Sequence, residues 1–198
     1  MTLEPLTMQQ TKAARAIAIA GLSFTYPKST TPAVNGLDLD IDAGGIFALL
    51  GPNGSGKTTV FQILSTLLHP QAGNVHVFGI DVRKEPVQAR LQMGVIFQSP
   101  GLDKKLTVLE NLKAYGPIYG IKGKELAERI DFSLNRLGIA SEKNKLVGEL
   151  SGGLARRADI AKSLLARPRL ILMDEPTTAL DPAARIELWE YLKTLRQD

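Results

Sequence analysis

The residues with the clearest chemical potential form one run, Gly51-Pro52-Asn53-Gly54-Ser55-Gly56-Lys57-Thr58. It fits the pattern G-x-x-x-x-G-K-[ST] at every fixed position. Glycines let the backbone approach a phosphate and turn its N–H groups inward. Lys57 supplies a charge for the β- and γ-phosphates, and the Thr58 hydroxyl can ligate Mg²⁺. The run therefore predicts a site for a nucleoside triphosphate.

The segments on either side of this run fit such a site. Ile46 to Leu50 is an uninterrupted apolar stretch, as a strand buried on both faces needs. Behind the run, apolar residues recur at helical spacing until Pro70 and Gly73, namely Val60, Ile63, Leu64, Leu67 and Leu68. A helix opening at the run would point free N–H groups and its positive dipole end at the anion. We therefore expect a strand, a phosphate loop and a helix in that order.

Two adjacent carboxylates follow another apolar run. Leu170 to Met173 predicts a buried strand, and Asp174 and Glu175 come directly after it. Asp174 at the strand end can hold Mg²⁺ through water, while Glu175 can orient an attacking water as a general base. The alternative is a solvated acidic turn. Upstream, Leu150-Ser151-Gly152-Gly153 precedes a helix expected to begin near Leu154, which predicts a second anion-binding helix N-terminus.

Length and composition set limits on the class of protein. A chain of 198 residues has room for one domain with a sizeable core, and 44% apolar with 22% charged residues is typical of soluble globular proteins. The net charge of +4 requires no nucleic acid to explain it, since a nucleotide is itself a polyanion. The absence of cysteine excludes disulfides and thiolate chemistry. No apolar run reaches the roughly 20 residues of a membrane-spanning helix, so a membrane role would be peripheral.

The order of the remaining elements predicts the fold class. Leu37, Leu39 and Ile41 alternate with aspartates. This pattern favours a strand with one solvent-exposed face, in an antiparallel N-terminal part of the chain, called here the front end. Met93 to Phe97 predicts a buried strand ending at Gln98, and a helical insertion follows. From Pro182 an amphipathic helix is expected, with Ile186, Trp189, Leu192 and Leu195 on its buried stripe. Strands alternating with helices indicate an α/β fold with a mostly parallel sheet.

These motifs, in this order, resemble the nucleotide-binding domain of the ABC (ATP-binding cassette) ATPases from about Ala16 to the C-terminus. Leu150 to Gly153 is similar to the family signature, and Gln98 to its Q-loop. Thr178-Ala179-Leu180-Asp181 resembles the D-loop, and Tyr26 stands where the family has an aromatic that stacks on adenine. Alone, Tyr26 could simply be an aromatic ending a strand.

The resemblance implies a P-loop NTPase core with an antiparallel β subdomain and an inserted helical subdomain. Residues 1–198 would form one domain, with a loose tail at 1–11 and the helical subdomain at about 100–160. It implies ATP contacts from Tyr26, Gly51, Pro52, Asn53, Gly54, Ser55, Gly56, Lys57, Thr58 and Thr59.

The resemblance also implies roles for the other motifs. Thr58 and Gln98 would ligate Mg²⁺ with support from Asp174, and Glu175 would act as the catalytic base beside Lys57. In a head-to-tail dimer the signature residues would touch the γ-phosphate of the partner domain, namely Ser151, Gly152 and Gly153. Asp181 would cross the dimer interface.

The sequence departs from the family pattern at two places. Leu154 stands where the signature usually has glutamine. We expect the loss of this hydrogen-bonding side chain to alter the activity of the site and to leave the phosphate contacts of Ser151 and the two glycines intact. The family's last strand and its switch histidine are expected beyond Asp198, so the sequence predicts a C-terminally truncated domain. Such a chain should bind nucleotide better than it hydrolyses it.

The expected function is ATP hydrolysis that powers a membrane transporter, more specifically an exporter, with a separate transmembrane permease as partner and no nucleic acid. The chain would then lie at the cytoplasmic face of the membrane. Two alternatives stay open: a soluble ABC ATPase, and a regulatory module that binds nucleotide without turnover. The transported substrate would be chosen by the permease.

Overall fold

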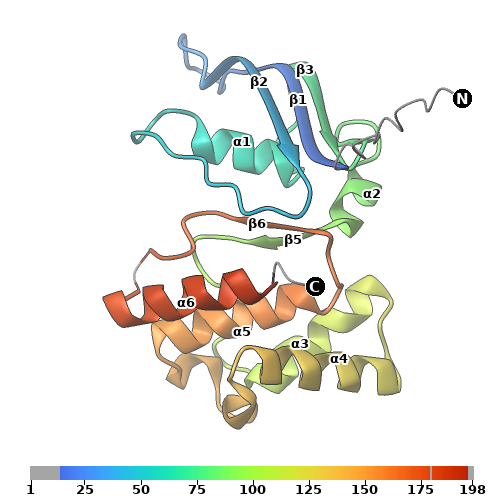
Figure 1. The fold of residues 1–198 in the computed structure, drawn as a ribbon, viewed down its shortest axis with the longest axis vertical. Coiled ribbons are helices and arrows are strands. Elements are labelled where there is room, and N and C mark those ends of the chain that lie inside the picture. The colour runs from blue at the N-terminus through green and yellow to red at the C-terminus, as the bar shows by residue number, and fades with distance from the viewer. Residues whose placement is uncertain (1–13, 179, 196–198) are drawn as a thin grey trace, which may run out of the picture.

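The computed structural model describes residues 14–178 and 180–195, so the tail expected at 1–11 and Ala179 lie outside the described residues. An antiparallel sheet with α1 (Lys57–Leu64) lies at one end, a helical layer at the other, and a short parallel pair between them (Figure 1). The strands are β1 (Arg15–Phe24), β2 (Val34–Asp42), β3 (Ala72–Val77), β4 (Ile80–Asp81), β5 (Met93–Ile96) and β6 (Leu170–Met173). The other helices are α2 (Pro86–Leu91), α3 (Val108–Tyr115), α4 (Gly123–Arg136), α5 (Gly152–Leu164) and α6 (Pro182–Leu195), with 3₁₀ turns at Gly116–Tyr119, Ala140–Glu142 and Val147–Glu149.

Alternating residues build the antiparallel sheet, which has the order β2-β1-β3-β4. Ile19 in β1 pairs with Leu39 on one side and with Val75 on the other. Ile19 and Val75 belong to one hydrophobic cluster together with Ile63 of α1, and the partly buried Leu39 packs against it, while the aspartates of β2 remain exposed. The expected antiparallel front end is confirmed, and its apolar face holds α1 in place.

The parallel sheet consists of β5 and β6 in the part of the chain that the structure describes. Met93 pairs with Leu170 and Ile96 with Met173, so both strands end at the same edge. A bond from the Asp174 N–H to the Ile96 carbonyl (3.0 Å) extends the ladder by one step. The expected α/β class is present, and the pair places the residues after β5 beside those after β6.

The strand predicted at residues 46–50 is wrong. This segment forms no ladder with any described strand, and its apolar side chains are exposed, from 42% at Leu49 to 87% at Leu50. An apolar run becomes a strand only where its N–H and C=O groups find ladder partners. The described strands supply none at this place, so the segment reaches the phosphate loop as irregular backbone.

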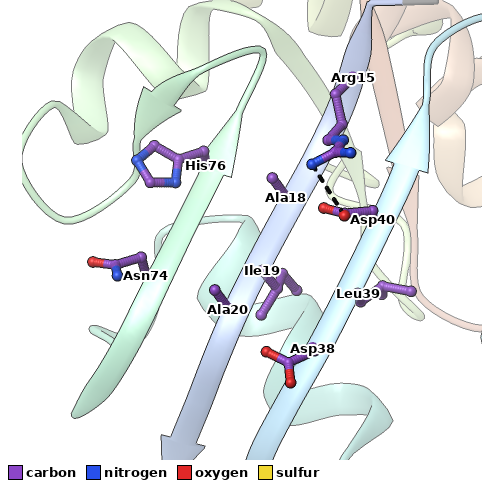
Figure 2. Close-up of a pocket in the computed structure, with 9 residues that line it drawn as sticks. All are labelled: Arg15, Ala18, Ile19, Ala20, Asp38, Leu39, Asp40, Asn74 and His76. Carbon is purple, nitrogen blue, oxygen red and sulfur yellow. Dashed lines mark ion pairs between the residues drawn. The ribbon is translucent and has the colours of Figure 1, made fainter.

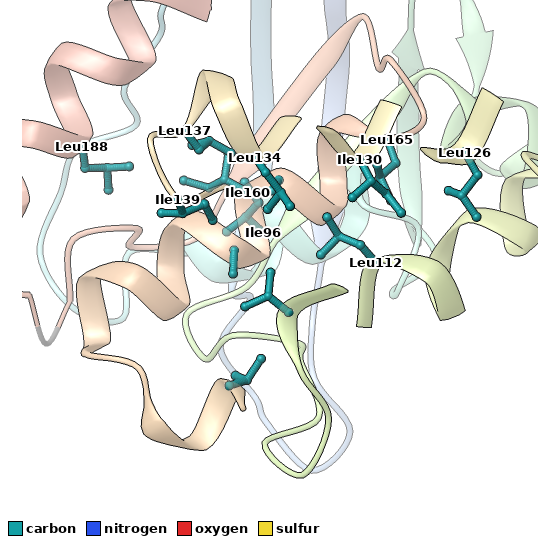
Figure 3. Packing of buried hydrophobic residues seen from close by; sticks show 14 of the residues in the cluster. Ile96, Leu112, Leu126, Ile130, Leu134, Leu137, Ile139, Ile160, Leu165 and Leu188 are labelled. Carbon is teal, nitrogen blue, oxygen red and sulfur yellow. The ribbon is translucent and has the colours of Figure 1, made fainter. Parts of the chain in front are cut away.

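The helical insertion between β5 and β6 is confirmed. It opens at α3 with a capping box, in which the Thr107 side chain accepts from the Glu110 N–H and the Glu110 side chain accepts from the Thr107 N–H. The insertion packs around one cluster (Figure 3) whose fully buried members include Leu112, Ile130 and Ile160. This core holds α5 against the other helices.

Two helices differ from their predicted form. Helix α1 ends at Leu64 and not at Pro70, because Thr66 adopts a φ of 64° that interrupts the helix and leaves Leu67 58% exposed. In α6 the predicted buried stripe is wrong at two of its four residues, since Ile186 is 65% exposed and Trp189 is 41% exposed.

The buried side of α6 is set by contact with the helical cluster. Leu188 is buried there, and Ala184, Tyr191 and Leu192 pack against the same cluster. Of the predicted stripe only Leu192 therefore faces this core, and the side chain of Leu195 lies outside the described residues. The apolar residues of α6 cover more than one side of the helix, so spacing alone could not choose between them.

Candidate nucleotide site

The turn of the phosphate loop depends on glycine. Gly54 and Gly56 have φ values of 80° and 88°, a region that side chains other than glycine rarely enter. At Gly56 a Cβ atom would lie 2.4 Å from the Ala33 carbonyl oxygen. Glycine therefore lets the loop pack against the backbone of the β1–β2 connection, and α1 starts at the next residue.

Lys57 folds back over the loop. Its Nζ donates to the carbonyl oxygens of Gly51 (2.9 Å) and Pro52 (2.8 Å). Among the described residues no side chain caps the N-terminus of α1, so the N–H groups of its first turn can bind an anion. Phosphate oxygens can replace the carbonyls as acceptors for Lys57 with no change in fold.

A hollow of about 320 Å³ lies over the loop. It joins the aromatic after β1, the phosphate loop, the start of α1 and the glutamate after β6, its lining being Tyr26, Ala33, Asn53, Gly54, Gly56, Lys57, Thr58, Thr59 and Glu175. Of the residues predicted to touch ATP, only Gly51, Pro52 and Ser55 are outside this lining. Segments distant in the sequence thus meet at one concave site.

Tyr26 is held at the rim of the hollow by α1. Its hydroxyl lies 3.2 Å from the Thr59 Oγ1 and donates to the Gln62 Oε1 at 3.1 Å. Its ring stands edge-on to Phe24, with ring centroids 5.0 Å apart. The side chain is 39% exposed, so the hollow has an aromatic wall on which a flat base can stack.

The carboxylate of Glu175 is oriented by two donors. Thr178 Oγ1 donates to its Oε2 at 3.0 Å and Gln98 Nε2 donates to the same atom at 3.4 Å. Glu175 also has a φ of 44°, a conformation that costs energy in residues other than glycine and is frequent at functional sites. The backbone strain and the two donors turn this side chain toward the phosphate loop.

Asp174 interacts electrostatically with Glu175 and with Lys57 of the phosphate loop. Burial raises the pKa of Asp174, the neighbouring Glu175 raises it further, and Lys57 lowers it. A bound cation would act in the same direction as Lys57 and favour the ionised carboxylate. Lys57 therefore offsets only part of the effect of burial and of Glu175, and the pKa of Asp174 stays above its ordinary value.

The predicted Mg²⁺ residues offer the oxygen donors that this ion prefers: the Thr58 hydroxyl, the Gln98 amide and the Asp174 carboxylate. Thr58 shares the hollow with Glu175, Gln98 contacts Glu175, and Asp174 interacts with it. Among the described residues no group of three or more acidic, histidine or cysteine side chains could hold a metal alone. The residues fit an ion that takes its remaining ligands from phosphate oxygens and water.

The signature segment forms a separate site. Ser151 caps α5 by accepting from the Leu154 N–H (3.3 Å), and a Cβ at Gly153 would lie 3.3 Å from the Cβ of Ala184 in α6. Asp181 caps α6 by accepting from the Ala184 N–H (3.0 Å). Neither Ser151 nor its two glycines line the hollow over the phosphate loop of the same chain, so the contacts expected in trans stay predictions.

Sequence reasoning missed several contacts around the site, including that of Thr178, which it placed only in the D-loop. The Ala33 carbonyl supports the loop, Thr178 orients Glu175, and a buried charged group on α5 consists of Arg156, Asp159 and Lys162. The signal for that group was present as alternating charges three residues apart on a helix. Such a pattern usually marks a solvated face, and only the packing of α5 on β5 shows that it is buried.

A larger hollow of about 530 Å³ lies on the face of the antiparallel sheet away from α1 (Figure 2). Small side chains of β1 form its floor, and an exposed ion pair between Arg15 and Asp40 (3.0 Å) stands at its edge. His76 and Asn74 line it from β3. No residue predicted to bind nucleotide belongs to it, so it is distinct from the phosphate-loop site.

The fold and the site define the class of this protein. A phosphate loop before a helix, paired carboxylates after a parallel strand and a serine-capped second helix beyond a helical insertion make it a P-loop NTPase of the ATP-binding cassette type. The family model described as ABC transporter matches residues 34–178. The chain belongs to the ABC transporter family, as its resemblance implied.

Curated relatives and solved structures agree with this assignment. The chain is 40% identical to the daunorubicin/doxorubicin resistance ATP-binding protein DrrA of Streptomyces peucetius over 93% of this chain and 56% of that protein. It is 41% identical to the Nod factor export ATP-binding protein I of Cupriavidus metallidurans over 82% of this chain and 54% of that protein. The chain thus spans about half the length of the curated relatives that it matches.

The fold is similar to that of solved cassettes. The structure of cbiO1 from Clostridium perfringens, part of the ABC transporter complex cbiONQ, matches with a TM-score of 0.84 and 29% identity over 93% of this chain and 74% of that one. A bacterial ABC transporter cassette solved as a dimer matches with a TM-score of 0.80 and 29% identity, over 91% of this chain and 83% of that one. In the part of this chain that the structure describes, no helix combines the length and apolar character needed to cross a membrane.

Proposed function

We propose that this chain binds Mg-ATP in the hollow over its phosphate loop and hydrolyses it as the ATP-binding subunit of an ABC exporter. One observation carries the proposal: Glu175 lines the same hollow as Lys57 and Thr58. A general base, a phosphate-binding cation and a hydroxyl in one hollow fit the attack of water on a γ-phosphate.

In this proposal each residue has a defined task. Lys57 exchanges the Gly51 and Pro52 carbonyls for phosphate oxygens, and Tyr26 stacks on adenine. Thr58, Gln98 and Asp174 are the residues that would hold Mg²⁺, which when bound neutralises charge on the phosphates. Glu175 takes a proton from the attacking water.

A second cassette would complete the site. We propose that Ser151, Gly152 and Gly153 of one domain reach the γ-phosphate held by another, with Asp181 at the interface. The exposure of Ser151 and Gly152 at the N-terminus of α5 supports this arrangement. So does the similarity to a cassette that was solved as a dimer.

The names of the relatives support export over the two alternatives, a soluble ABC ATPase and a regulatory module without turnover. One relative is described by drug resistance and another by Nod factor export. We propose that the membrane-spanning helices belong to a separate permease, which would keep this chain at the cytoplasmic face of the membrane. We also propose that nucleic acid is not among its partners.

Purification of the protein from its native membrane, followed by a Mg²⁺-dependent ATPase assay, tests the whole proposal. A polytopic membrane protein should co-purify, and Glu175→Gln should abolish most of the turnover. Hydrolysis without such a partner would favour the soluble ATPase. Binding of ATP without hydrolysis, with or without the partner, would favour the regulatory module.

A further inference from the structure

We propose that Arg156, in the helix that starts at the signature, is a positioning residue that fixes Gln98 for its metal. The inference rests on the nucleotide site of the proposed function and assigns a role to a residue that lies outside the hollow. It concerns the loop at residues 97–101, which connects the end of β5 to the helical insertion.

The first observation is the way Arg156 binds this loop. Its side chain is buried, with 2% of the residue exposed. Nη1 donates to the Phe97 carbonyl at 2.5 Å and Nη2 donates to the Gln98 carbonyl at 2.5 Å. One planar group thus holds two successive peptide units, which fixes the direction in which the Gln98 side chain leaves the backbone.

The second observation is a clamp at the far end of the same loop. Asp159 Oδ1 accepts from the Gly101 N–H (3.1 Å) and from Lys162 Nζ (2.8 Å). Lys162 Nζ in turn donates to the Gly101 carbonyl (2.8 Å). A Cβ at Gly101 would lie 3.0 Å from that Nζ, so glycine leaves room for the contact. Residues from one side of α5 therefore hold both ends of the loop.

Burial of these charged groups costs free energy, which indicates a role beyond packing. Burial lowers the pKa of Arg156 while Asp159 raises it, so the guanidinium is desolvated with partial compensation. Within the described part of the chain the Asp159 Oδ2 has no hydrogen-bond partner, although Arg156 Nη1 lies 3.8 Å from it. Apolar side chains could hold α5 on β5 without this cost. What they could not do is orient the two peptide units of the loop.

The oriented side chain belongs to the nucleotide site. Gln98 Nε2 donates to Glu175 Oε2 at 3.4 Å, so the amide oxygen is the atom of this side chain that would bind a metal. Residues that hydrogen-bond to a metal ligand without binding the metal themselves change the affinity of the site for the ion. Arg156 fits this role because it bonds the backbone of Gln98 and lies outside the hollow.

The test compares the affinity for a fluorescent ATP analogue, MANT-ATP, in Mg²⁺ and in EDTA. Arg156→Met should reduce the ratio of the two affinities about 10-fold or more, the usual loss when a supporting group of a metal ligand is removed. Affinity in EDTA should stay unchanged. Arg129→Met is the matched control, because Arg129 also donates to a backbone carbonyl, that of Leu165 at 2.6 Å, but bonds no residue of the loop.

A ratio for Arg156→Met equal to that of the control would overturn the inference, and so would a wild-type ratio of one. If Arg156→Met does not fold, Arg156→Lys decides the question, since lysine keeps the charge but cannot hold both carbonyls in one plane. The same fall in the ratio is expected for it. A wild-type chain that binds no MANT-ATP in either condition would instead overturn the proposed function, and this inference with it.

Discussion

Gln98 and Glu175 meet at the adjacent ends of two parallel strands, where the amide nitrogen of one donates to the carboxylate of the other across 3.4 Å. The register that pairs Ile96 with Met173 produces this meeting. A predicted metal ligand and the predicted base therefore share a hydrogen bond. Movement of either side chain away from the other would break this bond.

Replacement of Lys57 should remove most of the affinity for Mg-ATP. Lys57→Ala deletes the cation that can turn from its own loop to the β- and γ-phosphates. Hydrogen bonds to charged groups contribute about 1.5–3 kcal/mol, which corresponds to a loss of about 10- to 150-fold. Calorimetric titration with ATP measures this loss, with Lys124→Ala, an exposed residue of α4, as the control. Equal affinity in wild type and Lys57→Ala would show that the loop is not the site.

Replacement of Glu175 should separate binding from chemistry. Glu175→Gln keeps the shape of the side chain and the bond from Thr178, but it cannot take a proton from water. Steady-state hydrolysis should fall about 10²- to 10⁴-fold, while ATP affinity is retained and an ATP-bound dimer accumulates on size-exclusion chromatography. Glu128→Gln, exposed on α4, is the control. Hydrolysis by Glu175→Gln at the wild-type rate would assign the base elsewhere.

Two substitutions of Tyr26 should give different results. Tyr26→Ala removes the ring and should weaken ATP binding by about 1–3 kcal/mol, the usual value of stacking on a base. Tyr26→Phe keeps the ring and loses only the bonds to Thr59 and Gln62, so its affinity should stay close to wild type. Calorimetric titration compares them. A large loss for both variants would mean that the hydroxyl, and not stacking, matters.

Asp174 should destabilise the nucleotide-free protein at neutral pH. Its pKa is raised above the ordinary 3.8, so the folded chain binds this proton more tightly than the unfolded chain and ionisation costs stability. Asp174→Asn should therefore raise the melting temperature at neutral pH. The difference should shrink as the pH falls through the folded-state pKa and close below 3.8.

Thermal melts at a series of pH values measure this difference, with Asp131→Asn, an exposed residue of α4, as the control. A lower melting temperature for Asp174→Asn at neutral pH would contradict the prediction. With Mg²⁺ and ATP bound, the wild type should instead melt at a higher temperature than Asp174→Asn. A cation stabilises the ionised carboxylate, and the asparagine offers it no charge.

Much of the site could be predicted because its parts are local. Lys57 follows its glycines directly, Ser151 caps the helix that it precedes, and Asp174 follows an apolar strand. Each of these placements depends on a few neighbouring residues. The order of the motifs then identified the family without any knowledge of long-range contacts.

The features that sequence reasoning missed depend on distant partners. Residues 46–50 are as apolar as a buried strand, yet strand formation depends on a neighbour that must be supplied from elsewhere in the fold. Ile186 and Leu188 are similar in chemistry, and only the position of the helical cluster decides that Leu188 is buried. Arg156 carries a charge that is typical of surface residues, and its burial depends on β5 and on the loop that follows this strand.

The short parallel pair between the two ends of the molecule has a consequence for how the chain opens. Met93 belongs to the hydrophobic cluster of the antiparallel sheet, whereas Ile96, in the same strand, belongs to the cluster of the helices. Leu172 of β6 also belongs to the first cluster while Ile171 packs against the second, so the two cores meet along the β5–β6 pair, in which each strand is only four residues long. Two parts of a chain that share so small a contact can act as separate cooperative units with different opening free energies.

Native-state hydrogen exchange should therefore divide the amides into two groups, one in β1 to β3 and α1 and the other in α3 to α5. Nucleotide bound to both the phosphate loop and Gln98 should bring their exchange rates together.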